Sequence, residues 1–191
     1  ISIGDVNMSN SGDSSIFVSG FDQFVSPQNV VLLGESSNGI VEDLHKVGNE
    51  IFLVGRTEKE SVFGDSSIPS GDFLVKLNGD KTVAFVRSTA SGSAVSTLPS
   101  GEIVSIGSRV EKRASDGTPI WNYPKDGLGI STDGKGFIYL SGDFRDTEEF
   151  NPESKTSKGG LDAFVAKFGL VTANVRPSDI TFSSYVLREN L

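Results

Sequence analysis

Residues 138–142, Ile-Tyr-Leu-Ser-Gly, decide the fold class of this chain. The run of apolar and aromatic residues is long enough for a β-strand and too short for a helix. It follows the polar turn 132–135, Thr-Asp-Gly-Lys, in which Gly and Asp are the residue types that favour tight turns. Similar short apolar runs and turn signals alternate along the chain. The sequence therefore predicts an all-β fold.

The same pattern of a short strand followed by glycine occurs four times. The strand glycines, which lie 35, 52 and 35 residues apart, are Gly20, Gly55, Gly107 and Gly142. After two of them a phenylalanine follows at a distance of eight residues, at Phe63 and Phe150, and a second strand comes next. Two elements that recur in the same order indicate an internal repeat. We expect the repeated sheets to stack on one another, because one meander cannot bury both of its faces.

Residues 142–152, Gly-Asp-Phe-Arg-Asp-Thr-Glu-Glu-Phe-Asn-Pro, and 159–168, Gly-Gly-Leu-Asp-Ala-Phe-Val-Ala-Lys-Phe, resemble the bacterial β-propeller repeat of the SBBP type. The copy over 55–77 resembles it as well, whereas 109–114 departs from the Asp-x-Phe pattern. The resemblance covers residues 1–169 and implies a partial β-propeller of about three to four blades, each an antiparallel meander. Such repeats are typical of large exported bacterial proteins, in which they usually serve as binding or scaffold modules.

The end of the chain differs from the repeats. Residues 175–183, Val-Arg-Pro-Ser-Asp-Ile-Thr-Phe-Ser, and 186–191, Val-Leu-Arg-Glu-Asn-Leu, resemble the first strand of a cadherin-like domain. We therefore expect repeats over 1–169, and a linker and this strand over 170–191. The resemblance implies that Glu189 joins an inter-domain calcium site. The other acidic motifs of such a site are absent from this sequence. A lone strand has an unpaired edge, so either the polypeptide was cut here or the strand pairs with another element.

Composition limits the classes of function. The chain has 191 residues, of which 36% are hydrophobic and 22% charged, as in a globular domain. It has no cysteine, which excludes disulfides and cysteine–zinc sites. The formal charge of −8 repels phosphate backbones, so nucleic acid is not an expected partner. No apolar run approaches the roughly 20 residues that cross a bilayer. Because the chain begins at Ile1 and its only methionine is Met8, we expect a processed or truncated amino terminus.

Carboxylates gather around Arg145, in the segment that follows the strand ending at Gly142. They are Asp143, Asp146, Glu148 and Glu149. Paired carboxylates can act as general acid and base in sugar hydrolysis, and carboxylate oxygens also hold calcium. The segment lacks the alternating Asp-x-Asp-x-Asp-Gly of a calcium loop, so a solvated connecting loop is the favoured interpretation. Asp143, Asp146 and Glu148 remain ligand candidates.

Two aromatic residues, Trp121 and Tyr123, mark the first place to look for a bound sugar, although core packing is favoured for both. The only histidine, His45, has no nucleophile elbow to accompany it and is interpreted as a solvated strand-edge residue. Asp72 and Asp162 recur in the repeat and are expected to accept backbone N–H bonds. The recurring aromatics are expected to pack between adjacent sheets; they are Phe63, Phe73, Phe150 and Phe164.

The sequence and the resemblance together favour a non-enzymatic binding, adhesion or scaffold module of a larger exported bacterial protein. The expected location is extracellular or at the cell surface, the expected partners are proteins or cell-surface glycans, and calcium is the one cofactor implied. Two alternatives stay open. One is a carbohydrate-active propeller enzyme that uses the carboxylates near residues 143–149, and the other is a structural subunit of a larger assembly.

Overall fold

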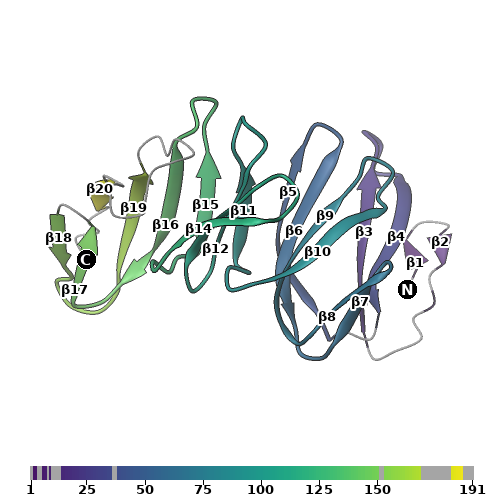
Figure 1. The fold of residues 1–191 in the computed structure, drawn as a ribbon, viewed down its shortest axis with the longest axis horizontal. Helices are drawn as coiled ribbons and strands as arrows, with labels where there is room; N and C mark the ends of the chain where they lie inside the picture. The colour runs from purple at the N-terminus through teal and green to yellow at the C-terminus, as the bar shows by residue number, and fades with distance from the viewer. Residues whose placement is uncertain are drawn as a thin grey trace. The chain divides into compact units, whose positions relative to one another are not determined.

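The computed structural model describes residues 2–3, 6–7, 9, 14–35, 38–150, 153–168 and 182–186. All regular secondary structure in these residues is β-strand, arranged in antiparallel sheets, which confirms the all-β prediction (Figure 1). The chain divides into two compact units, Ile1–Thr89 and Ala90–Leu191. This boundary lies within the region over which the sequence predicts one run of repeats.

The first unit contains two four-stranded sheets and a short pair of strands. One sheet has the order β3-β4-β7-β8, formed by Ser15–Phe21, Pro27–Glu35, Ser61–Phe63 and Ser66–Ile68. The other has the order β5-β6-β9-β10, formed by Ile40–Val47, Glu50–Thr57, Gly71–Leu77 and Val83–Thr89. The short pair is β1 (Ser2–Ile3) and β2 (Val6–Asn7). Both large sheets contribute to one buried core, which includes Ile16, Leu53 and Phe63.

The second unit also contains two four-stranded sheets. One has the order β11-β12-β13-β14, formed by Ala94–Thr97, Ile103–Ile106, Val110–Arg113 and Pro119–Tyr123. The other has the order β15-β16-β19-β20, formed by Gly129–Thr132, Ile138–Phe144, Asp162–Phe168 and Phe182–Val186. Strands β17 (Thr147–Phe150) and β18 (Glu153–Thr156) make a separate hairpin (Figure 1). A single buried core joins the two large sheets.

The two large sheets of the second unit meet along their first strands, β11 and β15. The side-chain oxygens of Ser96 and Thr132 lie 3.1 Å apart, and the Thr132 hydroxyl donates to the Thr97 carbonyl oxygen at 2.6 Å. Hydroxyl contacts at the first strands therefore complement the apolar core between the sheets.

Strand β20 comes from the tail that resembles a cadherin-like strand. Its backbone pairs with β19, with Phe182 opposite Phe168 and Val186 opposite Phe164. Residues 182–186 therefore complete a sheet of the second unit, which is one of the two outcomes that the sequence left open for a strand with an unpaired edge.

The strand that carries Gly20 differs from those of the other repeated glycines. Strands β6, β12 and β16 each have neighbours on both sides, whereas β3 lies at the edge of its sheet and pairs with β4. The shared sequence pattern thus does not give the first segment the same place in its sheet. A strand-then-glycine pattern describes one strand locally, and it does not specify which strand comes to lie beside it.

In two copies of the repeat, the strand glycine lies opposite a phenylalanine of the neighbouring strand. Gly55 lies opposite Phe73, and Gly142 lies opposite Phe164. A Cβ atom at Gly55 would come within 2.9 Å of the Phe73 ring, and one at Gly142 within 2.8 Å of the Phe164 ring. Each ring therefore occupies the space that the glycine leaves empty. The glycine of the first strand and the phenylalanine of the second strand thus form the same packing contact in both copies.

The recurring phenylalanines that the structure describes are buried, as predicted. Phe63 and Phe73 are fully buried, and their ring centroids lie 5.2 Å apart at a tilted angle that suits aromatic packing. Phe164 is buried in the core of the second unit. The side chain of Phe150 lies outside the described part of the structure.

Five of the described hairpin turns share one geometry. In each turn of five residues, the N–H of the first residue donates to the carbonyl oxygen of the fifth, and the N–H of the fourth residue donates to the carbonyl oxygen of the first. The first residues of these turns are Asp22, Asn78, Leu98, Ala114 and Asp133. The fourth residue has a positive φ, which is a conformation that suits glycine. Glycine occupies it in three turns, at Gly101, Gly117 and Gly136, whereas the other two have Val25 at φ 64° and Lys81 at φ 65°.

We expect Val25→Gly to raise the free energy of unfolding by about 1 kcal/mol. The left-handed conformation costs a side chain with a Cβ about 1–2 kcal/mol, which exceeds the entropy that glycine loses on folding. Val25 is also 75% exposed, so little packing is lost. Urea denaturation measures the change. The matched reverse substitution, Gly101→Val, should lower the midpoint, and a loss of stability in Val25→Gly would contradict the expectation.

Candidate functional site

The aromatic candidates, Trp121 and Tyr123, lie on β14 two residues apart and so share one face of the sheet. Both pack against the core of the second unit. The ring of Tyr123 meets the ring of Phe168 edge-on, with centroids 5.9 Å apart. These two side chains therefore contribute to the packing between the sheets.

The carboxylate candidates have different environments. Asp143 is exposed at the end of β16, and Asp146 is exposed in the connection to β17 with a φ of 55°. Glu148 lies on β17 with a partly exposed side chain. In the described part of the chain, no three His, Asp or Glu residues are grouped so that they could hold a metal ion. Glu189 lies outside the described residues, and its calcium role stays a prediction.

Lys125, which sequence analysis did not single out, pairs with Glu148. Its Nζ lies 2.7 Å from Glu148 Oε1, and its side chain is only 4% exposed. The same ammonium group lies over the ring of Phe164, 4.7 Å from the centroid, which is within the range of a cation–π interaction. Lys125 follows β14 and Glu148 lies on β17, so this pair ties the connection between the two large sheets to the β17–β18 hairpin. No local pattern links the two residues in the sequence.

The Lys125–Glu148 pair also affects its neighbour Tyr123. Burial raises the pKa of the Tyr123 phenol, and the negative charge of Glu148 raises this pKa further. The phenol therefore stays protonated at neutral pH. The Lys125–Glu148 ion pair is suited to holding the hairpin in place.

Two other basic residues are buried in the second unit on neighbouring positions of β13. Lys112 is 1% exposed, and its Nζ lies 2.7 Å from Glu102 Oε1. Arg113 lies 2.7 Å from Glu111 Oε2, and it also donates to the Gly117 carbonyl oxygen. Burial raises the pKa of Glu102. Hydrogen bonds from Lys112 and Ser100, together with the charge of Lys112, lower this pKa by more, so that it lies below its usual value. Ion pairing thus compensates the burial of these charges.

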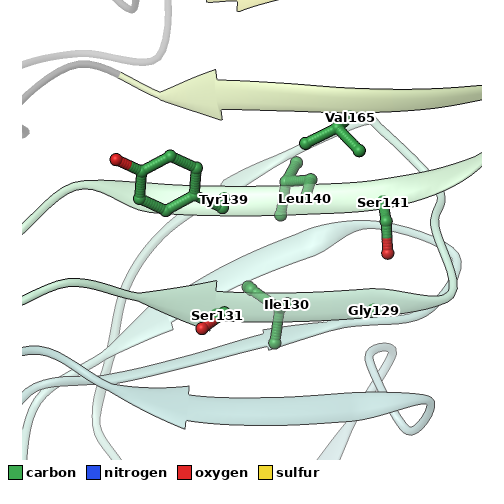
Figure 2. Close-up of a pocket in the computed structure, with 7 residues that line it drawn as sticks. All are labelled: Gly129, Ile130, Ser131, Tyr139, Leu140, Ser141 and Val165. Atoms are coloured by element: carbon green, nitrogen blue, oxygen red, sulfur yellow. The ribbon is translucent and has the colours of Figure 1, made fainter. Parts of the chain in front are cut away.

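A pocket of about 300 Å³ lies on the sheet formed by β15, β16 and β19 (Figure 2). The register puts Ser131 opposite Tyr139, and Ser141 opposite both Gly129 and Val165, so these five residues share one face. That face points away from the core of the second unit. Leu140 lies on the opposite face of the sheet and belongs to this core. The Tyr139 hydroxyl donates to Asp133 Oδ2 at 3.2 Å, which orients the ring.

The three other residues that the sequence singled out, Asp162, Asp72 and His45, lie on β-strands. Asp162 accepts a backbone N–H bond from Lys158 at 3.1 Å, as its position before a strand predicts. Asp72 lies in β9 opposite Arg56. His45 lies on β5, which is an edge strand as expected, but the side chain is half-buried rather than fully solvated.

Comparison of the chain with protein-family models and with curated proteins finds no match. The described residues include no helix that is long and apolar enough to cross a membrane. The likeness to SBBP-type repeats and to a cadherin-like strand therefore rests on the sequence motifs.

Proposed function

We propose that this chain is a non-enzymatic binding or scaffold module of a larger exported bacterial protein, and that its four-stranded sheets are blades of a β-propeller. The resemblance to SBBP-type repeats motivates this proposal. Two features of the structure support it, namely the pairing of two four-stranded sheets around one core in each unit and the repeated contact between glycine and phenylalanine. The proposed location is outside the cell or at its surface, and the proposed partners are proteins or glycans.

The main support for a binding role is the pocket face, which is the face of the sheet β15-β16-β19-β20 on which the pocket lies. It offers an oriented aromatic ring, Tyr139, beside the exposed hydroxyl groups of Ser131 and Ser141. An apolar ring with a few polar groups near it suits a small polar ligand such as a sugar unit. The carboxylates near residues 143–149 support an enzyme less, because Glu148 already pairs with the buried Lys125.

A panel of glycans, assayed for both binding and hydrolysis, tests the proposal. We expect binding without hydrolysis. Tyr139→Ala should weaken this binding about tenfold, equal to a loss of about 1.4 kcal/mol, whereas Tyr139→Phe should keep most of it because the ring remains.

The Asp146→Asn variant distinguishes the proposed binding role from the alternative role as a carbohydrate-active enzyme. Asparagine tolerates the positive φ of this position, so the variant should keep the fold. The binding proposal expects unchanged glycan binding in this variant. Hydrolysis by the unmodified chain that disappears in Asp146→Asn would contradict it and favour the enzyme.

A further inference from the structure

Lys167 lies on the pocket face without a carboxylate partner among the described residues. The register places it on β19 directly opposite Tyr139, and it lies two residues from Val165, so it shares the face on which these two residues line the pocket (Figure 2). Its Nζ lies 3.7 Å from the ring centroid of Phe137 and 5.5 Å from that of Tyr139. An aromatic face attracts a cation but leaves its N–H groups able to donate to an anion.

The corresponding lysine of the first unit, Lys76, has a carboxylate partner within the chain. It lies on β9 opposite Phe52, as Lys167 lies on β19 opposite Tyr139. The Nζ of Lys76 also lies over an aromatic ring, 5.5 Å from the centroid of Phe52. In addition, it lies 2.6 Å from Glu50 Oε1. The same arrangement of lysine and aromatic ring therefore includes a carboxylate in the first unit.

In the second unit an aromatic residue stands at the position of this carboxylate. Glu50 lies two residues before Phe52, and Phe137 lies two residues before Tyr139. Phe137 thus takes the place of Glu50, and its ring lies next to the ammonium group of Lys167. The second unit keeps the cation and lacks the built-in anion, so a ligand is able to supply one.

Two neighbouring positions of this face also differ between the copies. Phe52 and Val54 are fully buried, whereas Tyr139 is half-buried and Ser141 is exposed. Each pair lies at the same distance before its strand glycine. The second copy therefore presents an aromatic ring and a hydroxyl group to solvent beside the ammonium group of Lys167. A ring and hydroxyl group with a cation near them suit a sugar that carries an acidic group.

The carboxylates of this face leave the cation free for a ligand. Asp133 interacts electrostatically with Lys167, but its oxygens already accept two backbone N–H bonds of its own turn and the hydroxyl bond from Tyr139. Asp143 lies near the opposite end of β16 from Tyr139. Neither carboxylate forms an ion pair with Lys167 in the described structure.

We propose that the ligand of the pocket face is a carboxylated sugar, namely a uronic acid unit, whose carboxylate pairs with Lys167 while its ring lies against Tyr139. The ammonium group supplies charge-assisted hydrogen bonds, which are stronger than those of a neutral sugar hydroxyl. The inference rests on the proposed glycan binding and names the class of sugar that is bound.

The test measures the binding of uronic acid oligosaccharides to the full chain, each beside its own methyl ester, which keeps the sugar and removes the charge. The panel contains oligomers of glucuronate, galacturonate, mannuronate and guluronate. We expect at least one acid to bind at least about tenfold more tightly than its ester at low ionic strength. Lys167→Gln should abolish this preference, whereas Lys167→Arg should keep most of it, because a guanidinium group also binds carboxylates and stacks on rings.

Phe137→Glu tests the comparison between the two copies. It introduces into the second unit the carboxylate that Glu50 supplies in the first, so Lys167 should pair with it. The preference for acid over ester should then fall about tenfold. A preference that this variant leaves unchanged would show that a carboxylate at this position does not compete with the ligand, which would overturn the inference.

Lys158→Gln is the matched control. It removes the same charge from an exposed residue in the connection before β19, at the opposite end of this strand from Lys167. The preference for acid over ester should persist in this variant, and its loss would assign the preference to net charge and overturn the inference.

Three further results would overturn the inference alone, namely binding of neutral glycans but not of the acids, equal binding of acids and esters, and a preference that survives Lys167→Gln. The proposed glycan binding would still stand if Tyr139→Ala weakened the binding that is observed. Absence of binding to every glycan tested would contradict the proposed function as well.

Discussion

Gly55→Ala is expected to lower the free energy of unfolding of the first unit by about 3 kcal/mol or more. A Cβ atom at this position would collide with the Ile40 carbonyl oxygen and would lie 2.9 Å from the ring of Phe73. The first contact is with backbone, so β5 must move away from β6. Overpacking of a buried site typically costs about 1–3 kcal/mol, and displacement of a strand adds to that cost.

Chemical denaturation with hydrogen exchange as a local probe measures the effect of Gly55→Ala. Protection should fall in β5, β6 and β9. Gly134→Ala is the control, because no atom lies within 4 Å of a Cβ at that turn position, and its stability should change by no more than about 0.5 kcal/mol. An unfolding midpoint for Gly55→Ala equal to that of the unmodified chain would disprove the role of the glycine.

Glu148→Gln is expected to have the second largest effect, a loss of about 3 kcal/mol in the stability of the second unit. The substitution leaves the ammonium group of Lys125, which is 4% exposed, without its carboxylate partner. Removal of one member of a buried ion pair typically costs about 3–5 kcal/mol, and the partial exposure of Glu148 places the estimate at the lower end.

The reciprocal variant, Lys125→Met, should cost less than Glu148→Gln. It leaves a carboxylate whose side chain is 35% exposed and can be hydrated, and the methionine keeps contact with the ring of Phe164. A double-mutant cycle with Lys125→Met and Glu148→Gln should show a coupling energy of about 1–2 kcal/mol. Equal costs for the two single variants, or no coupling, would show that the pair does not anchor the hairpin.

The candidate site was predictable only in part. Trp121, Tyr123 and Glu148 were identified from the residue types in their neighbourhood, and the structure brings Tyr123 and Glu148 close enough for the carboxylate to raise the pKa of the phenol. Lys125 was missed because no spacing rule connects it to Glu148. The pocket face was missed as well, because Ser131, Tyr139 and Val165 come together only when β15, β16 and β19 pair.

The sequence by itself determined the all-β class, the positions of most turns and the recurrence of the strand glycines and of the phenylalanines. These features depend on a residue and its near neighbours, since turn formation and strand length are local properties. Only the tertiary structure decided that β3 lies at an edge, that residues 182–186 join the second unit and that Lys125 pairs with Glu148. Sheet pairing joins residues that are far apart in the chain, and its result depends on which strand comes to lie alongside.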